Sequence, residues 1–191
     1  MSDLINSPKV AIIGGNSLQL ASELGLTLTS LEEADVALFL VSAEQGIVSA
    51  DLESWRMARE LYIPSLVIIC DLAKSEIDFD DMALIAGKML DPVVTPFLVL
   101  HDDHGTPIAL IDLLKLEISD YTHGESELKE PDSEHVELVK EFRDELLQQL
   151  EDAGEDSFQA GLLFPALPWI EGTKIGLDQI KDYLTQIPII S

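Results

Sequence analysis

Short apolar runs alternate with segments of helical periodicity over the first hundred residues. Continuous apolar runs are typical of strands covered on both faces, and here they occupy Lys9–Ile13, Val36–Val41, Leu66–Cys70 and Val93–Leu100. Between them, apolar side chains recur at helical spacing in three segments: from Asn16 or Ser17 to Gly25, Ser49–Leu61 and Asp78–Leu90. Strands alternating with helices of about ten residues imply βαβ crossovers. We therefore expect an α/β fold with three layers and a mostly parallel sheet.

The ends and faces of these helices follow from individual residues. Asn16 or Ser17 can cap the first helix and Gly25 can close it, and a short strand is expected next at Leu26–Thr29. Helical spacing predicts that the following apolar side chains face inward: Leu18, Leu20, Ala21, Leu24, Leu52, Trp55, Met57 and Ala58. The same spacing places Arg56, Arg59 and Glu60 partly outward.

The second half of the chain has a different pattern. We predict a half-exposed strand at Ile108–Ile118, a polar loop at Tyr121–Ser133 and a long amphipathic helix at Glu134–Asp152. A strand at Leu162–Ala166 and a helix at Gly176–Leu184 follow. The length suits a single domain over residues 1–191, with an insertion-like region at about 102–155.

The net charge of the chain excludes some classes of function. The formal net charge is −25, with 11 Lys and Arg against 36 Asp and Glu, so the chain lacks the basic footprint needed to bind nucleic acid directly or an anionic membrane. As its partner we expect another protein, or a second copy of the chain in a homo-oligomer. The acids between Glu125 and Asp156 fit a solvated helix face, and the alternative is that they mimic nucleic acid or engage a basic partner. The single cysteine, Cys70, and the lack of an apparent signal peptide or membrane span predict a reduced, cytoplasmic protein.

Several segments together resemble a known family. The stretch from Ala34 to Ala58 carries Asp35, Gly46, Trp55, Arg56 and Ala58 where the GTPase domain of translation elongation factor G has a "DGA" strand, "GV" and "T-x-W-R-Q-A". The later segments Ile63–Asp71, Ile111–Lys115 and Ile175–Leu184 resemble "VPRIAFVNKMD", "VDLVK" and "GVQ-x-LLDAV-x-DYLPSP", in the family's order. The resemblance covers Ala34 to Pro188 and implies a P-loop GTPase-like fold.

The nucleotide motifs of that family are absent or altered. Where a P-loop would need Gly-x-x-x-x-Gly-Lys-Ser/Thr, the chain has Gly14, Gly15, Asn16 and Ser17, and no Lys occurs between Lys9 and Lys74. The resemblance places Cys70, Asp71 and Ala73 where the family's Asn-Lys-x-Asp recognises guanine, and Pro165, Ala166 and Leu167 at its Ser-Ala-Phe/Leu element. The first strand can match either the family's first or its third strand.

These changes favour a degenerate GTPase-like domain without catalysis or cofactor, which acts in protein interaction. The first alternative is a translational GTPase relative that retains weak binding of GTP or GDP with Mg²⁺, or of the ribosome. A second is a small-ligand enzyme of Rossmann type that uses Gly14 and Gly15, although its Gly-x-Gly-x-x-Gly spacing is missing.

Four smaller candidates have ordinary structural explanations. The amino end of the helix at Asn16 and Ser17 could bind an anion. His101 and His104, with the two aspartates between them, could ligate a metal or simply form a polar turn. Cys70 beside Asp71 suits core packing better than nucleophilic chemistry. Trp169, in a loop bounded by prolines, is either a partner anchor or packed beneath that loop.

Overall fold

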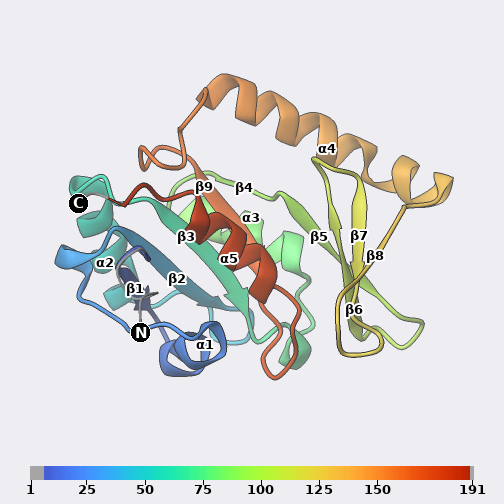
Figure 1. Ribbon diagram of the computed structural model, residues 1–191, viewed down its shortest axis with the longest axis horizontal. Helices are drawn as coiled ribbons and strands as arrows, with labels where there is room; N and C mark the ends of the chain where they lie inside the picture. Colours follow the sequence, from blue (N-terminus) through green and yellow to red (C-terminus); the bar gives the residue numbers. More distant parts are fainter. Residues whose placement is uncertain (1–6, 190–191) are drawn as a thin grey trace.

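The computed structural model describes residues 7–189 and contains two sheets (Figure 1). The first is parallel, with strand order β1-β2-β3-β9-β4. Its strands are β1 (Val10–Ile13), β2 (Val36–Ser42), β3 (Ser65–Cys70), β4 (Val93–Val94) and β9 (Phe164–Pro168). The second is antiparallel, in the order β5-β6-β7-β8, with β5 (Phe97–His101), β6 (Pro107–Asp112), β7 (Glu117–Asp120) and β8 (Glu127–Lys129).

Helices cover both faces of the parallel sheet, which confirms the three-layer α/β fold. α1 (Ser17–Leu24) and α5 (Leu177–Thr185) share a buried apolar cluster on one face, and α2 (Ser49–Glu60) and α3 (Phe79–Met89) contribute to another on the opposite face. In Figure 1, α5 crosses in front of the sheet and α3 lies behind it. Both faces of the central strands are therefore buried, as their continuous apolar runs predicted.

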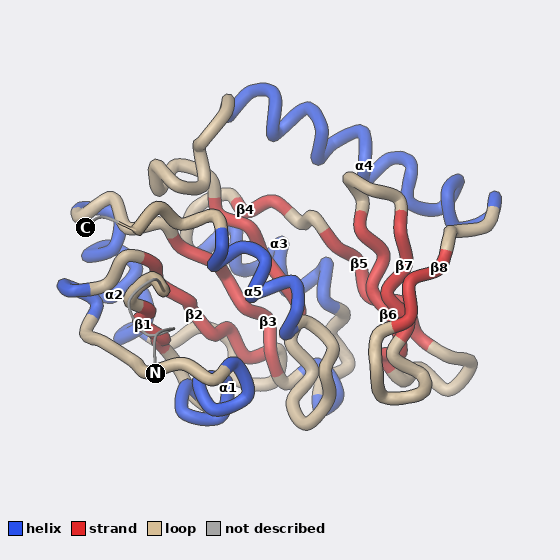
Figure 2. Tube along the Cα trace, viewed as in Figure 1, coloured by secondary structure: helices blue, strands red, loops and turns tan. Residues whose placement is uncertain are grey.

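The long helix α4 (Ser133–Ala153) belongs to the second sheet (Figure 2). Its buried side chains Val139 and Leu146 join a third apolar cluster with Ala109, Ile111 and Ile118 of the antiparallel strands. The predicted insertion-like region overlaps this sheet and helix, and the domain boundaries remain a prediction. Within residues 7–189, no helix combines the length and the apolar character needed to cross a bilayer.

Two predicted strands are each divided in the structure. The expected strand Val93–Leu100 separates into β4 and β5, in different sheets, at Pro96, which has no N–H to donate to a ladder. The expected strand Ile108–Ile118 is a β-hairpin of β6 and β7. Asp112 Oδ1 accepts bonds from the backbone N–H groups of Leu114 and Lys115, at 2.8 and 3.0 Å, and thereby favours a turn over an extended chain.

Other predictions about single elements and side chains also differ from the structure. Tyr121–Ser133, expected as a loop, contains the exposed edge strand β8, and Leu26–Thr29 forms only a bridge between Leu28 and Val10. Leu18 and Met57 were predicted to face inward but are 79% and 37% exposed, since Leu20, Ala21 and Leu24 set the buried face of α1, and Trp55 and Ala58 that of α2. Arg59, predicted partly outward, turns its guanidinium inward over the rings of Trp55 and Phe164.

Candidate functional site

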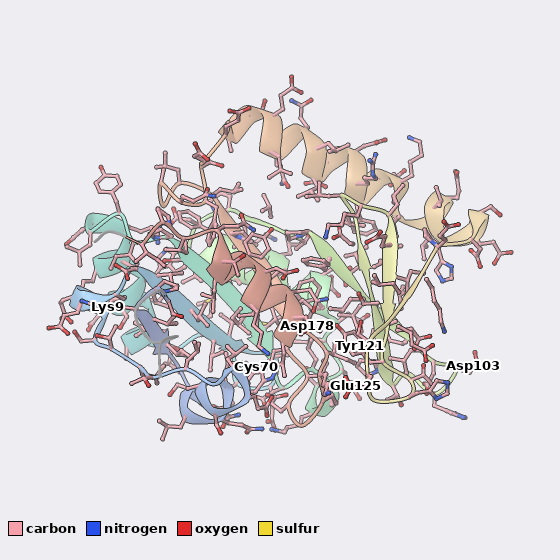
Figure 3. The ribbon with its side chains drawn as sticks, viewed as in Figure 1. Lys9, Cys70, Asp103, Tyr121, Glu125 and Asp178 are labelled. Carbon is pink, nitrogen blue, oxygen red and sulfur yellow. The ribbon has the colours of Figure 1, made fainter. Side chains whose placement is uncertain are left out.

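The carboxyl ends of β1, β2 and β3 meet around a small crevice. Because the three strands are parallel, the residues that follow each of them gather at one edge of the sheet. The crevice has a volume of about 220 Å³ and is lined by Gly14, Gly15, Asn16, Leu40, Ser42, Gln45, Gly46, Val48, Asp51, Cys70 and Asp71. Figure 3 shows Cys70 at this end of β3. The position corresponds to the ligand-binding edge of open α/β sheets.

The connection from β1 to α1 is short and tightly packed. Only Gly14, Gly15 and Asn16 separate Ile13 from the first residue of α1. Gly14 has φ 110°, and a Cβ there would lie 2.8 Å from the Leu40 carbonyl oxygen. Asn16 adopts the left-handed conformation at the start of α1, but its side chain makes no capping hydrogen bond, contrary to the expectation of a side-chain cap.

Asp71 is the centre of a polar network at the end of β3. The Ser42 hydroxyl donates to Asp71 Oδ2 at 2.7 Å, and Lys74 Nζ contacts Asp71 Oδ1 at 2.5 Å. The backbone N–H of Asp71 donates to Glu171 Oε1 at 2.9 Å, which joins this strand to the loop between β9 and α5. Burial raises the pKa of the Asp71 carboxyl, but the bonds from Lys74 and Ser42 outweigh it and hold that pKa below its ordinary value.

Negative charge therefore dominates the crevice. Asp51 is a second carboxylate of its lining, and burial raises the pKa of Asp51, partly offset by a backbone hydrogen bond. Glu171 adds a third carboxylate beside Asp71, and the ammonium of Lys74 is engaged by Asp71. A phosphate entering here would meet carboxylates where a phosphate site needs cations.

Cys70 is held as a protonated thiol. It is 2% exposed, and burial, followed by the nearby charges of Asp71 and Glu171, raises the pKa of Cys70 to about 12. Its Sγ donates to the Val41 carbonyl at 3.6 Å. Potential ligand atoms of Cys70, Asp71 and Glu171 lie within 4.8 Å of one another, but the thiol is protonated and Asp71 already accepts from Ser42 and Lys74. These contacts fit core packing, not nucleophilic chemistry.

The structure brings together only some of the residues that the sequence singled out. Gly14, Gly15, Asn16, Cys70 and Asp71 line the crevice. Ser17 begins α1 and Ala73 is exposed in the short 3-10 helix Leu72–Lys74; neither lines it. Pro165, Ala166 and Leu167 are buried inside β9, because that strand runs on to Pro168 and the loop after it starts only at Trp169. Whether any of these residues contacts a nucleotide remains a prediction.

The histidine pair and Trp169 have structural explanations. His101 and His104 are exposed at the turn between β5 and β6, where Asp102 Oδ1 accepts from the backbone N–H groups of His104 and Thr106 at 2.9 Å each. Within residues 7–189, the pair is not part of any cluster of three potential metal ligands. Trp169 is fully buried and donates from Nε1 to Glu23 at 3.0 Å, so it is packed and does not anchor a partner.

The polar residues of the site that were not singled out from the sequence include Ser42, Asp51 and Glu171. Ser42 ends β2, and its position at a strand end was the one available indication. Asp51 lies in the first turn of α2, where an acidic residue is ordinary. Glu171 lies 100 residues from Asp71 in sequence, and no spacing rule connects them.

Comparisons with known proteins support the resemblance. No family model matches the chain. Two curated relatives, each named "Elongation factor G-like protein", come from Mycobacterium tuberculosis strains CDC 1551 / Oshkosh and ATCC 25618 / H37Rv. Each is 24% identical over 190 residues, covering 87% of this chain and 26% of the relative. A solved structure from Thermus thermophilus superposes with a TM-score of 0.73 at 26% identity, over 83% of this chain and 27% of the other. The chain thus spans about a quarter of the length of these proteins, and its resemblance to the GTPase domain of elongation factor G is confirmed.

Proposed function

We propose that this chain is a GTPase-like domain that does not hydrolyse GTP and serves as a protein-interaction module. The observation that carries the proposal is the carboxylate lining of the crevice at the ends of β1, β2 and β3. Asp51 and Asp71 line the crevice at the edge where open α/β sheets bind their ligands. Coulomb repulsion in a partly buried site opposes phosphate binding there.

Size and composition of the crevice support the same conclusion. Its volume of about 220 Å³ is below the ~300–1,000 Å³ that is usual for small-molecule sites. The connection between β1 and α1 contains no lysine that could reach a phosphate, and Lys74 is the cation bonded to Asp71. Oxyanion stabilisation, on which phosphoryl transfer depends, would need such groups.

A second candidate function is that of a translational GTPase relative that retains weak binding of guanine nucleotide or of the ribosome. The name of the M. tuberculosis relatives, "Elongation factor G-like protein", favours it. Under this alternative, Asp71 and Asp51 would be the residues that hold Mg²⁺, and the ion would offset their negative charge beside a phosphate.

Thermal unfolding with millimolar GTP, GDP or ATP plus Mg²⁺ separates the two functions. A ligand at 100 times its dissociation constant stabilises a protein by about 2.7 kcal/mol, which raises the melting temperature by roughly 5–10 °C for this size. We expect no shift beyond that of Mg²⁺ alone. A rise specific to GTP and GDP that disappears in Asp71→Asn would contradict the proposal and favour the second function.

A further inference from the structure

The solvent side of α3 carries large apolar side chains. Phe79, Met82, Ala83 and Ala86 fill the core, but Leu84 is 58% exposed, and Ile85 and Met89 are also exposed. Exposed apolar side chains that cluster on one helix face are characteristic of contact surfaces. Of these three exposed side chains, Leu84 lines the groove between α3 and α4.

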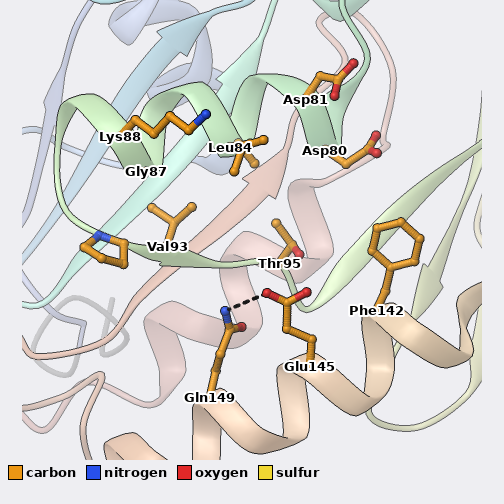
Figure 4. A pocket seen from close by; sticks show the side chains of 12 residues that line it. Asp80, Asp81, Leu84, Gly87, Lys88, Val93, Thr95, Phe142, Glu145 and Gln149 are labelled. Atoms are coloured by element: carbon orange, nitrogen blue, oxygen red, sulfur yellow. Dashed lines mark hydrogen bonds between the residues drawn. The ribbon is translucent and has the colours of Figure 1, made fainter.

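The groove runs between the side of α3 that carries Leu84 and α4 (Figure 4). α4 packs on the antiparallel sheet through Val139 and Leu146, which leaves the flank with Phe142, Glu145 and Gln149 turned toward α3. The groove has a volume of about 420 Å³, and its lining consists of Asp80, Asp81, Ala83, Leu84, Gly87, Lys88, Pro92, Val93, Thr95, Phe142, Glu145 and Gln149. Leu84, Val93 and Phe142 give it an apolar centre large enough for one or two side chains.

Charged groups flank the apolar centre unevenly. Asp80 and Asp81 lie at the amino end of α3, and Lys88 lies near its other end (Figure 4). Glu145 adds a third carboxylate from α4 and accepts from Gln149 Nε2 at 3.4 Å. In the described part of the chain, Asp80, Asp81 and Lys88 take part in no ion pair. A ligand with positive charge beside its apolar groups would complement the end formed by the two aspartates.

We propose that this groove binds an amphipathic segment of a protein partner, whose apolar side chains contact Leu84, Val93 and Phe142 and whose Lys or Arg side chains pair with Asp80, Asp81 and Glu145. The proposal rests on the role as an interaction module and names its surface and its partner's chemistry. A second copy of the chain is a poor occupant, because its 11 basic residues are scattered among 36 acidic ones.

The test uses a fluorescein-labelled, 14-residue peptide of Leu and Lys at helical spacing, titrated with the full chain and followed by fluorescence anisotropy. Leu84→Glu is compared with Leu128→Glu, which changes another exposed leucine (70%) on β8 and alters net charge identically. We expect Leu84→Glu to weaken binding about tenfold or more and Leu128→Glu to leave it within about twofold. Similarly, Asp81→Lys is expected to weaken binding more than Asp103→Lys, on the turn after β5.

Each outcome decides the proposal. Equal binding by Leu84→Glu and Leu128→Glu, or equal losses in the two aspartate variants, would mean that only the overall negative charge attracts the peptide, and would overturn the groove. Absence of binding by the unsubstituted chain would overturn it too. Neither result depends on nucleotide. A guanine-specific thermal shift would instead overturn the proposed function, so the two failures are distinguishable.

Discussion

Arg59 provides the sharpest test of how this chain is held together. From α2, one of its NH groups donates to the Gly161 carbonyl at 2.8 Å, and another donates to the Ile63 carbonyl at 2.9 Å and the Ser65 hydroxyl at 2.6 Å. Its Cζ lies 4.6 Å from the ring centroid of Trp55 and 4.0 Å from that of Phe164. Arg59 thus joins α2 and the segment before β3 to the loop that leads into β9. We predict that Arg59→Met destabilises the protein substantially.

The expected magnitude follows from what methionine keeps and loses. Its apolar side chain still packs on the two rings, and Ser65 still donates to the Ile63 carbonyl at 2.9 Å. The Gly161 carbonyl loses its charged donor, and leaving such a buried group unsatisfied lowers the free energy of unfolding by about 1–3 kcal/mol. Loss of the cation–π contacts lowers it by a further ~0.5–2 kcal/mol. Burial, partly offset by the charge of Asp91, lowers the pKa of Arg59 to about 10, and this unfavourable desolvation is relieved by the substitution. A net loss of about 3 kcal/mol results from these opposing contributions.

The assay is urea unfolding at pH 7, with Arg56→Met as the matched control. Arg56 is exposed on the same helix, and a surface change of this kind is expected to stay within about 0.5 kcal/mol. A loss of about 3 kcal/mol corresponds to a melting temperature lower by roughly 6–12 °C. A loss below about 1 kcal/mol for Arg59→Met, or equal losses for both variants, would refute the reasoning that the guanidinium stabilises this junction.

Two further predictions concern the crevice. Gly14→Ala is expected to cost about 1–3 kcal/mol in urea unfolding, since a Cβ at φ 110° meets the Leu40 carbonyl, whereas Gly15→Ala, in open space, is expected to change stability by less than about 0.5 kcal/mol. Because the pKa of Asp71 is lowered in the folded state, its contribution to stability is present above its unfolded pKa of about 4 and is lost as pH falls through the folded value. Asp71→Asn should therefore destabilise the protein at pH 7 and flatten this acid-side decline; an unchanged pH profile would contradict the assignment.

The sequence predicted the parallel sheet because its strands are buried on both faces and are therefore continuous apolar runs. The predicted strands were too long where a single residue interrupts a run of apolar neighbours, as Pro96 and Asp112 do. The inward turn of Arg59 was equally inaccessible, because its acceptors at Gly161 and Ser65 come from other segments. Tertiary context decides such contacts.

In the candidate site, too, contacts between residues near strand ends could be predicted, and contacts between distant segments could not. Gly14 to Asn16 and Cys70 to Asp71 follow parallel strands, so their proximity could be anticipated once the sheet was predicted. The contact between Asp71 and Glu171 could not be, since it depends on where β9 ends. Pro165, Ala166 and Leu167 lie inside β9 and not in the loop after it for the same reason, because the end of that strand is not evident from the sequence.

The crevice at the carboxyl edge and the groove between α3 and α4 both follow from the way the core is divided. The apolar clusters of the parallel sheet and its four helices do not include Gly15, Asn16 or Asp71, so the carboxyl edge can lose phosphate-binding groups at such positions while the core keeps its packing. The antiparallel sheet and α4 have their own apolar cluster, centred on Ile111, Val139 and Leu146. α3 packs mainly in the cluster of the parallel sheet and α4 in that of the antiparallel sheet, and apolar side chains stay exposed along the groove between the two helices. A binding surface at this junction requires no residue of the crevice, so the proposed loss of nucleotide chemistry and the proposed protein partner are compatible in one domain.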